Sequence, residues 1–557
     1  MKLFLQKNHR LIFYGTWLLL GLMQAGLTEL QDDEAYYWVF SRYLDWGYFD
    51  HPPMIAVLVK MGYAIFPNEL GVRLFPLLLN ILSLVIIEKL TGKKNPLLFY
   101  AISLSMAVIQ VTGFVAVPDI PLIFFAALFF LCYKRFIQNF SWLNTLLLGV
   151  AVALLFYSKY HAVLIVFFTL LSHLKLFTKY QAYFAGVIAL LLFAPHLWWQ
   201  YQHDWISFRY HLFESNVNAY KPSFTASYIF GQLLLPGPVA GFILLPAAFL
   251  YKTKNATEKA LRFTMIGMYI FFLLSSFRGK VEGNWTSPAL VCLIILSHQY
   301  LVEKLSWQKW LIKLLPVTLI LVLFVRIVMI ADILPVKEIQ QRFHAWKNWP
   351  AAMKEKTKGL PVVFSNSYQR ASKYWFYSGQ MTLSQNLYNE RRNNYNFWPI
   401  ENELIGKPVY FLDIYDLKRF PDSLKTPIGY VGYRYDSSFL SFGTFHMPFS
   451  AQHKIHQGDS LHLYYGGMPM PGTSQLYYLY RHPQSLYSTR LVFFQGKKII
   501  TEVPVSIDIY GISEKLLHLS LSLKPDLPKG HYQMMFTFAV PGYNPTHSSD
   551  KIKLTVE

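Results

Sequence analysis

A dense group of acidic and aromatic residues follows the first apolar segment of the chain, in the stretch TELQDDEAYYWVFSRYLDWGYFDHPPM at 28–54. It contains three consecutive acids, Asp32, Asp33 and Glu34, and later the pair Asp50-His51. A carboxylate can orient or deprotonate a hydroxyl, which is the chemistry of a general base. Acids at the mouth of a membrane cavity are functional candidates by default. The alternative is an amphipathic helix lying in the membrane interface, in which the acids are incidental.

The composition of the chain indicates a membrane setting for this acidic stretch. The chain has 557 residues, of which 54% are apolar and only 15% charged, and its mean hydropathy is +0.28. An ordinary soluble domain has roughly 25% charged residues, so a disordered chain is excluded and a purely soluble enzyme is disfavoured. The net charge of +20 would suit nucleic acid or an anionic membrane, and the apolar content favours the membrane. We therefore expect no nucleic-acid partner.

Apolar stretches recur along the first 334 residues and predict a polytopic α-helical membrane protein. About eleven of them approach the roughly 20 residues that span a bilayer. They centre on 11–27, 71–87, 97–116, 120–133, 143–157, 160–174, 182–199, 228–250, 263–277, 286–302 and 311–331. The first follows a basic start but shows no small-x-small cleavage site, so we interpret it as a transmembrane helix and not as a signal peptide.

The basic residues between these stretches predict the orientation. With a cytoplasmic N-terminus, the inward connections carry about 17 Lys and Arg and the outward ones about 8, which is the positive-inside asymmetry. An odd number of helices then places the C-terminal region outside. Two cysteines, Cys132 and Cys292, lie in apolar runs. We expect them to be buried, and to form neither a disulfide framework nor a thiolate metal site.

From about Pro335 the hydrophobic runs shorten and polar residues return. Residues 335–424 have mixed α/β character, with strand-like PVVFSN and KPVYFLDIY around a helix-like segment. Short alternating strands with turn signals follow at 425–557, which predicts a small β-sandwich-like domain. We thus expect a transmembrane domain at 1–334, with a catalytic loop at 28–70, and two soluble segments after it.

Several motifs occur together in the first 335 residues, in a fixed order. They are Asp33-Glu34, Asp50-His51-Pro52-Pro53, Arg73, Asp119 in VPDIPL, Lys159 in SKYHA, and Glu282-Gly283-Asn284-Trp285. As a set they resemble the polyprenyl-phosphate-sugar-dependent membrane glycosyltransferases of the GT-C type. That group includes the protein O-mannosyltransferases and the bacterial lipid A aminoarabinose and galacturonic acid transferases.

The resemblance implies a reaction and a location. A monosaccharide would be transferred with inversion from a polyprenyl-phosphate donor to a hydroxyl or phosphate of lipid A, another envelope glycan or a protein. The enzyme would lie in the bacterial inner membrane, with its N-terminus cytoplasmic and its C-terminal domain periplasmic. Asp33 would be the base, and Glu34 and Asp119 would support it.

The donor and acceptor need further groups, which the resemblance places on the outward side. The donor-phosphate candidates are His51, Arg73, Lys159, Arg209, Arg278 and Lys280. The substrate cavity would contain Tyr36, Tyr37, Asp50, Glu282, Asn284 and Trp285. Some relatives have an Arg three positions after the catalytic Asp and a Lys before Pro-Pro. This chain has Tyr36 and His51 there, so their phosphate clamp does not carry over unchanged.

Each of these candidates has a simpler interpretation. The Lys159 side chain could extend to the membrane interface, and Arg73 could lie at that interface at the start of its helix. Arg278 and Lys280 could be ordinary cations at the end of a loop. Trp285 could stack on a sugar or anchor the interface. A divalent metal stays open as a cofactor, because some relatives use one and histidines such as His161, His196, His203 and His211 fall near the outer face. No dense ligand motif accompanies them, so we assign no metal ligands.

Two other functions compete with glycosyl transfer. A transporter or flippase would place ionisable residues at helix midpoints and show internal repeats. The helix centres here are almost free of charge apart from Arg326, and no repeat is visible. A polysaccharide polymerase or ligase would share the lipid-linked donor, but the acids here lie in the first loop and the large soluble part is C-terminal.

Overall fold

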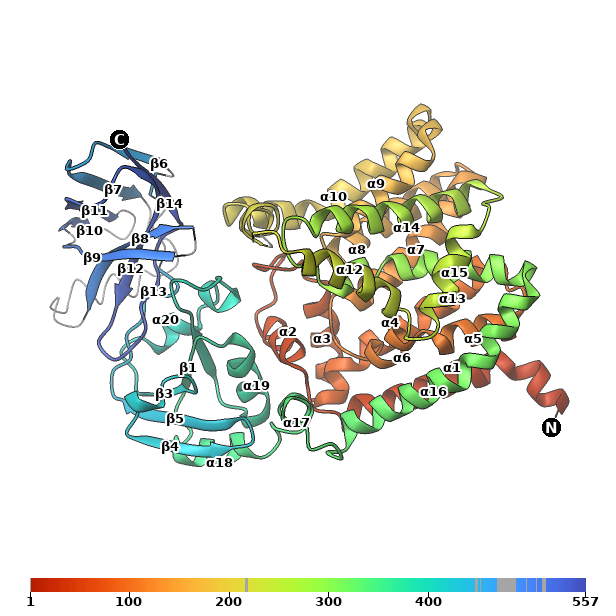
Figure 1. Ribbon diagram of the computed structural model, residues 1–557, viewed down its shortest axis with the longest axis horizontal. Helices are drawn as coiled ribbons and strands as arrows, with labels where there is room; N and C mark the ends of the chain where they lie inside the picture. The colour runs from red at the N-terminus through yellow and green to blue at the C-terminus, as the bar shows by residue number, and fades with distance from the viewer. Residues whose placement is uncertain are drawn as a thin grey trace. The chain divides into compact units, whose positions relative to one another are not determined.

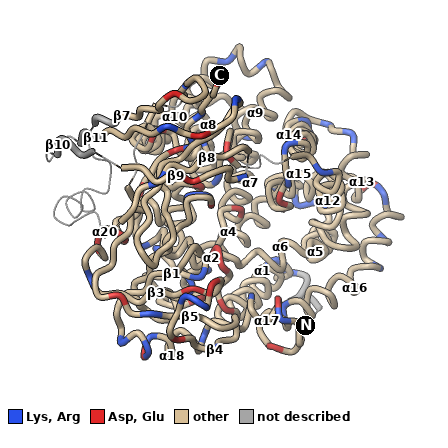
Figure 2. The backbone as a smooth tube through the Cα atoms, turned by 60° about the vertical axis from the view of Figure 1, so that its left-hand side comes forward, with Lys and Arg blue, Asp and Glu red and all other residues tan. Residues whose placement is uncertain are grey.

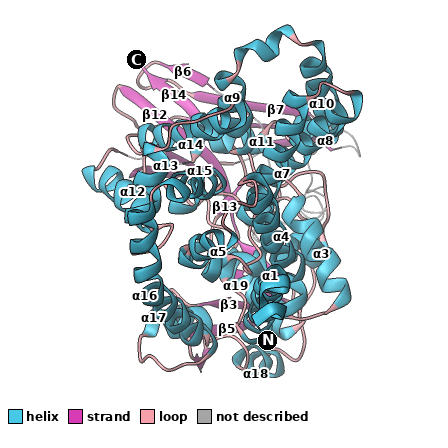
Figure 3. Cartoon of the chain, turned by 90° about the vertical axis from the view of Figure 1, so that its right-hand side faces the viewer, coloured by secondary structure: helices cyan, strands magenta, loops and turns pink. Residues whose placement is uncertain are grey.

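The chain folds into two units, residues 1–344 and 345–557, and each is described here by itself. The computed structural model describes residues 2–215, 219–445, 449–450, 452–467, 487–496, 498–506, 508–512 and 517–557. The first unit is helical and the second carries the strands, as Figures 1 and 3 show. The first unit extends past the predicted boundary at 334 because a short helix follows the last long one.

The first unit begins with helices α1 (Lys2–Leu27), α2 (Asp32–Arg42), α3 (Met54–Ile65), α4 (Glu69–Leu90), α5 (Pro96–Ser105), α6 (Ala107–Thr112), α7 (Asp119–Gln138), α8 (Trp142–Ser158) and α9 (Ala162–Ser172). It continues with η1 (Leu174–Thr178), α10 (Tyr180–Gln202), α11 (Ile206–Arg209), η2 (Tyr210–Glu214), α12 (Pro222–Leu234), α13 (Gly241–Leu250), α14 (Ala256–Ser275), η3 (Gly283–Thr286), α15 (Ala289–Glu303), α16 (Leu305–Ile330) and α17 (Lys337–Phe343).

Five of these helices are long and apolar enough to cross a membrane: 7–27, 69–90, 119–138, 180–202 and 305–330. Six shorter apolar helices, of 10–17 residues, accompany them. Most of the tube through the helices is tan in Figure 2, which shows how few charged residues they carry. A helix satisfies its own backbone polar groups, as the bilayer core requires. The predicted class of helical membrane protein is confirmed, and the number of spans stays a prediction.

The segment predicted as a catalytic loop, 28–70, contains two helices, α2 and α3. All three consecutive acids fall in the first turn of α2. Acidic side chains there interact favourably with the positive end of the helix dipole. The backbone N–H of Gln31 donates to Glu34 Oε2 at 2.9 Å, which satisfies one of the free donors at the helix start. The run of acids therefore has a local structural reason as well as any functional one.

Helix α4 is central to the first unit, since it packs against α1, α3 and α7. Its contact with α3 is close because glycines face each other. A Cβ atom on Gly62 would clash with the carbonyl oxygen of Gly71, and one on Gly71 would clash with that of Phe66. Both cysteines are free and buried among the apolar residues of this unit, as expected.

The second unit begins with helices and parallel strands. Its elements up to residue 436 are α18 (Trp349–Lys356), β1 (Val362–Ser365), α19 (Tyr368–Ser378), β2 (Thr382–Gln385), η4 (Asn394–Asn396), α20 (Ile400–Leu404), β3 (Val409–Asp413), η5 (Leu417–Arg419), β4 (Asp422–Thr426) and β5 (Gly429–Asp436). They form a five-stranded sheet in the order β2-β1-β3-β5-β4, in which β1 pairs in parallel with β2 and β3. The strand at 429–436, which the sequence placed with the sandwich, therefore belongs to the α/β sheet.

The rest of the second unit is antiparallel in most of its pairings. Its strands are β6 (Gln452–Ile455), β7 (Leu461–Gly467), β8 (Ser488–Gln495), β9 (Lys498–Pro504), β10 (Asp508–Ile512), β11 (Leu517–Leu523), β12 (Gly530–Ala539), β13 (Thr546–His547) and β14 (Ile552–Val556). Two sheets result, with the orders β10-β11-β7 and β6-β14-β12-β8-β9. Leu463 and Leu521 from one sheet share a hydrophobic cluster with Phe493 and Phe536 from the other. The predicted β-sandwich-like architecture is therefore present.

The α3–α4 contact generates the first testable prediction. Substituting Gly71→Ala should lower the thermal unfolding midpoint of the detergent-purified protein, because the backbone must shift to relieve the clash with Phe66. Overpacking of this kind costs about 1–3 kcal/mol, more than the roughly 1 kcal/mol that alanine gains over glycine in a helix. Gly186→Ala on α10 is the control, since nothing lies within 4 Å of its Cβ position. Equal midpoints for the two variants would contradict the close packing.

Candidate active site

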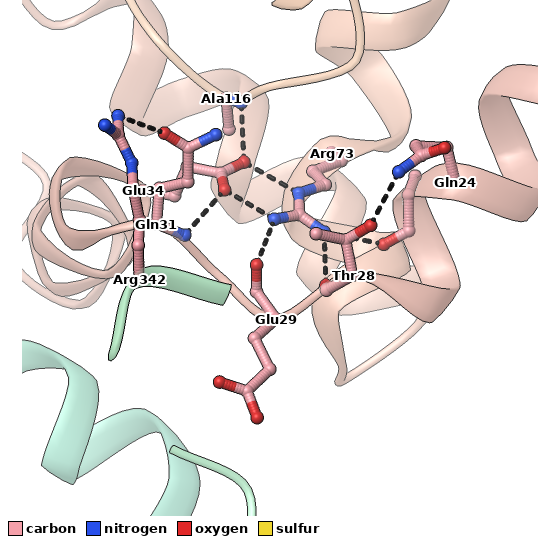
Figure 4. A network of polar contacts seen from close by, with 9 residues as sticks. Gln24, Thr28, Glu29, Gln31, Glu34, Arg73, Ala116 and Arg342 are labelled. Carbon is pink, nitrogen blue, oxygen red and sulfur yellow. Dashed lines mark hydrogen bonds and ion pairs between the residues drawn. The ribbon is translucent and has the colours of Figure 1, made fainter. Parts of the chain in front are cut away.

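Glu34 and Arg73 form a fully buried ion pair, with both side chains 0% exposed (Figure 4). Arg73 Nε donates to Glu34 Oε1 at 2.7 Å, and Arg73 Nη2 donates to Glu34 Oε2 at 2.5 Å. The remaining guanidinium hydrogens bond to backbone carbonyls of Ala25, Thr28 and Glu29, at 2.6–2.9 Å. All five donors of the arginine are thus directed at protein atoms.

Both carboxylate oxygens of Glu34 also have all their hydrogen-bonding capacity used, and their partners come from segments that are distant in the sequence. Besides Arg73, it accepts hydrogen bonds from the backbone N–H groups of Gln31 and, at 2.8 Å, Ala116. The pair therefore ties the C-terminal end of α1, the start of α2, the helix α4 and the loop before α7. Arg73 was expected to bind the donor phosphate and Glu34 to support catalysis. In the structure both side chains are bonded to protein groups, and these roles stay predictions.

Asp33 lies beside this pair but differs from it in exposure. It is exposed at the first turn of α2, whereas Glu34 on the next position is buried. Successive helix positions point in different directions, which accounts for the difference in exposure between these two acids. Tyr36 and Tyr37, expected in the substrate cavity, are buried on the same helix, and the Tyr37 ring lies 5.6 Å from that of His51.

A second buried ion pair joins Asp119, the first residue of α7, to Lys159, which follows α8. Lys159 Nζ donates to Asp119 Oδ1 at 2.8 Å, and the residues are 6% and 7% exposed. Ser287 Oγ donates to the same oxygen, and Asn284 Nδ2 donates to Oδ2 at 2.9 Å. Three predicted residues, Asp119, Lys159 and Asn284, are therefore in direct contact.

In this second pair, not all of the hydrogen-bond donors are used. The ammonium group of Lys159 has three N–H donors, and in the described part of the chain only Asp119 accepts from it. An ammonium with unused donors beside a buried carboxylate can bind an additional anion, such as a phosphate.

His51 and His211 lie near His161 in space, as Lys159 does. The ring of His211 is 5.1 Å from that of Tyr160, the residue between Lys159 and His161. His161 Nδ1 is buried, and no described residue is its hydrogen-bond partner. The ring of His161 lies 5.5 Å from that of Trp285, which also packs against Phe272 at 5.8 Å. The predicted Trp285 is thus part of the same cluster.

A short piece of chain connects the two ion pairs. Ala116 bonds to Glu34, and Asp119, which bonds to Lys159, comes three residues later. Three residues span at most about 11 Å between Cα atoms. Loop 113–118 therefore holds the start of α2 and the Lys159 cluster near each other. Asp50 is also buried, and its carbonyl oxygen is 2.9 Å from His211 Nε2.

The other predicted residues lie outside this arrangement or at its edge. Arg209 is half-buried at the end of α11, and Arg278 is exposed. Lys280 and Glu282 form an exposed ion pair with each other at 3.0 Å. Among the histidines, His196 is fully buried and its Nδ1 is 2.7 Å from the Trp46 carbonyl. No group of three or more His, Cys, Asp and Glu suited to a metal ion occurs within the described residues.

Sequence reasoning named His161 and His211 only as metal candidates and did not bring them together near Lys159. The signal for His161 was available, because it follows Lys159 by two positions in SKYHA. His211 ends the stretch HDWISFRYH, but only the fold brings this segment against the stretch around Asp50.

Comparison with known proteins shows what this chain is similar to. Residues 50–199 match the family model described as dolichyl-phosphate-mannose-protein mannosyltransferase. The fold is similar to that of two crystal structures of ArnT from Cupriavidus metallidurans. The apo structure has a TM-score of 0.57 at 12% identity, covering 77% of this chain and 98% of that one. The structure bound to undecaprenyl phosphate has a TM-score of 0.55 at 13% identity, covering 76% and 97%.

A curated relative extends the match in sequence. The lipid A galacturonosyltransferase RgtD of Rhizobium johnstonii is 25% identical over 305 residues, which is 52% of this chain and 63% of that protein. The match thus spans less than two thirds of the relative's length. Together with the ArnT fold, it confirms the resemblance to the membrane glycosyltransferases that was predicted from the sequence.

The buried pair generates a prediction about stability. Glu34→Gln should leave the Arg73 guanidinium buried without its counter-charge, at a cost of about 3–5 kcal/mol. We expect a clearly lower thermal unfolding midpoint in detergent. The matched control is Glu282→Gln, which breaks an ion pair whose side chains are more than half exposed and which should have little effect. A midpoint for Glu34→Gln equal to that of the control would show that the pair does not hold the unit together.

Proposed function

We propose that this protein is a membrane glycosyltransferase. It transfers a monosaccharide from a polyprenyl-phosphate donor to an acceptor group on lipid A. The observation that carries the proposal is the Asp119–Lys159 pair with its unused ammonium donors, placed in a fold like that of ArnT. The ArnT structure that contains undecaprenyl phosphate supports the donor class, and the name of RgtD supports lipid A as the acceptor.

The donor phosphate is expected at Lys159. Its ammonium lies 2.8 Å from Asp119 Oδ1, and His161 presents a buried nitrogen that can accept or donate a hydrogen bond. His51 takes the position before Pro-Pro that a lysine has in some relatives, and it lies near His161. We therefore propose that Lys159 supplies the fixed charge and that the histidines His51, His161 and His211 complete the phosphate site.

The acceptor side is assigned to Asp33. In the proposed reaction, the acceptor oxygen attacks the anomeric carbon of the sugar, and the bond from that carbon to the phosphate oxygen breaks. The acceptor proton passes to Asp33, and the polyprenyl phosphate leaves with the electron pair. Exposure of Asp33 at the start of α2, beside the rigid Glu34–Arg73 pair, suits a base that must meet an incoming acceptor.

Inversion, the inner-membrane location and the outward orientation of this site belong to the same proposal. The orientation rests on the positive-inside asymmetry of the connections. The second unit would then be periplasmic. Arg73 and Glu34 are proposed as positioning residues, and Tyr36, Tyr37 and Trp285 as walls of the substrate cavity.

A substitution at Asp33 tests the base. Asp33→Asn should abolish transfer, because an amide cannot accept the acceptor proton, and the protein should keep its wild-type thermal midpoint. The measurement is mass spectrometry of lipid A from a deletion strain complemented with each variant. Asp32→Asn is the matched control and should restore the modification. If Asp33→Asn restores it as well, the assignment of the base is wrong. If the deletion leaves lipid A unchanged, the proposed acceptor is wrong.

A second substitution tests the phosphate site. Lys159→Gln should weaken binding of undecaprenyl phosphate to the purified protein by about tenfold or more, since a charge-assisted bond is lost. Lys280→Gln, which removes an exposed cation on a loop, should bind as the wild type does. Binding can be followed by quenching of tryptophan fluorescence, with the thermal midpoint as a check on folding. Unchanged affinity of a folded Lys159→Gln protein would exclude Lys159 from the site.

A further inference from the structure

A cavity of about 810 Å³ lies in the first unit, away from the candidate active site. Its walls come from α1, α5, α6 and α16, and they include Phe13, Trp17, Leu97, Leu104 and Arg326. None of these helices carries a member of the Asp119–Lys159 cluster. Two of them, α1 and α16, are among the helices long and apolar enough to cross a membrane. Leu97 is 72% exposed, so the cavity opens on a surface that faces lipid.

Arg326 is the charged residue of this cavity. It is half-buried on α16, and it has no carboxylate within ion-pair distance among the described residues. Its Nη2 donates to the carbonyl of Gln110 at 2.5 Å and its Nη1 to that of Leu20 at 3.4 Å. Two of five N–H donors are thus used. A cation in a membrane-spanning helix is costly and by default indicates a function.

Two other polar groups of the cavity have partners. His9 Nδ1 is 2.8 Å from the hydroxyl of Tyr100, and the Gln110 side chain donates to the carbonyl of Leu104. The guanidinium is the charged group with unused hydrogen-bonding capacity in a wall that is otherwise apolar apart from His9, Thr16, Tyr100 and Gln110. A ligand that matches such a surface has one anionic group and a hydrocarbon portion.

The dimensions narrow the choice of ligand. The α1 wall runs from His9 to Leu20, which is about 16 Å at the helical rise of 1.5 Å per residue. That is close to half of a hydrocarbon core of about 30 Å, and so to the length of one leaflet's acyl chains. Arg326 lies four residues before the end of α16, about 6 Å along the axis, and its guanidinium is held at the level of Leu20 on α1.

We propose that this cavity binds an anionic membrane phospholipid. The phosphate would contact Arg326, and an acyl chain would lie along α1 and α5. A polyprenyl chain is much longer than this wall, which favours a phospholipid over the sugar donor. The site is separate from the Asp119–Lys159 cluster, because its residues belong to other helices.

The site has a structural connection to the buried pair. Gln24 donates both to the carbonyl of Arg326 at 3.3 Å and to the hydroxyl of Thr28 at 2.9 Å. The carbonyl of Thr28 in turn accepts from Arg73. A lipid bound at Arg326 would therefore stabilise the end of α1 on which the Glu34–Arg73 pair depends.

The test uses the full-length protein in detergent and native mass spectrometry. The protein is titrated with phosphatidylglycerol and with phosphatidylethanolamine that carry identical acyl chains. We expect the wild type to prefer phosphatidylglycerol by about tenfold, the effect of one partly buried charge contact. Arg326→Gln should remove this preference, and Arg326→Lys should keep most of it.

A second variant tests the cavity without touching the charge. Leu97→Trp fills the opening and should weaken binding of both lipids. Leu143→Trp, at an equally exposed apolar position on α8, should bind them as the wild type does. Three results would overturn the proposal: no preference in the wild type, wild-type binding by both Arg326→Gln and Leu97→Trp, or displacement of phosphatidylglycerol by undecaprenyl phosphate at lower concentration than by phosphatidylglycerol itself.

Discussion

The buried ion pair between Glu34 and Arg73 is the interaction on which the arrangement of the first unit depends. Two charges removed from water cost several kcal/mol each unless every donor and acceptor is satisfied. Here the guanidinium and the carboxylate reach that condition only when α1, α2, α4 and the loop before α7 all contribute. The pair therefore acts as a constraint: displacing any one of these segments leaves a buried charge with a missing partner.

The two buried ion pairs of this unit differ in how many of their hydrogen-bonding groups already have protein partners. Arg73 and Glu34 have no hydrogen-bonding capacity to spare for a substrate. Lys159 is bonded to Asp119 alone among the described residues, and His161 next to it has a buried nitrogen without a protein partner. Groups whose donors and acceptors are all used fix geometry, whereas a group with unused donors can bind a ligand. Loop 113–118 joins the two pairs, through Ala116 at one end and Asp119 at the other.

The comparison with ArnT shows how far the fold persists while residues change. The architecture is shared at 12% identity, yet the position before Pro-Pro holds His51 and the position three after Asp33 holds Tyr36. In the site proposed above, His51, His161 and His211 would complete phosphate binding with Lys159, where the sequence resemblance leads one to expect a lysine and an arginine in some relatives.

The sequence by itself determined the membrane class, the C-terminal β-rich region and the burial of the cysteines, and it named the acids after the first helix as candidates. These follow from hydropathy, alternation and motif order, which are local properties. The tertiary structure decided which candidates meet. It paired Arg73 with Glu34 and Lys159 with Asp119, moved strand 429–436 into the α/β sheet, and left Lys280 and Glu282 exposed. Such pairings join residues that are distant in the chain, and they depend on how helices pack and in which order strands pair. Local sequence patterns do not predict either of these.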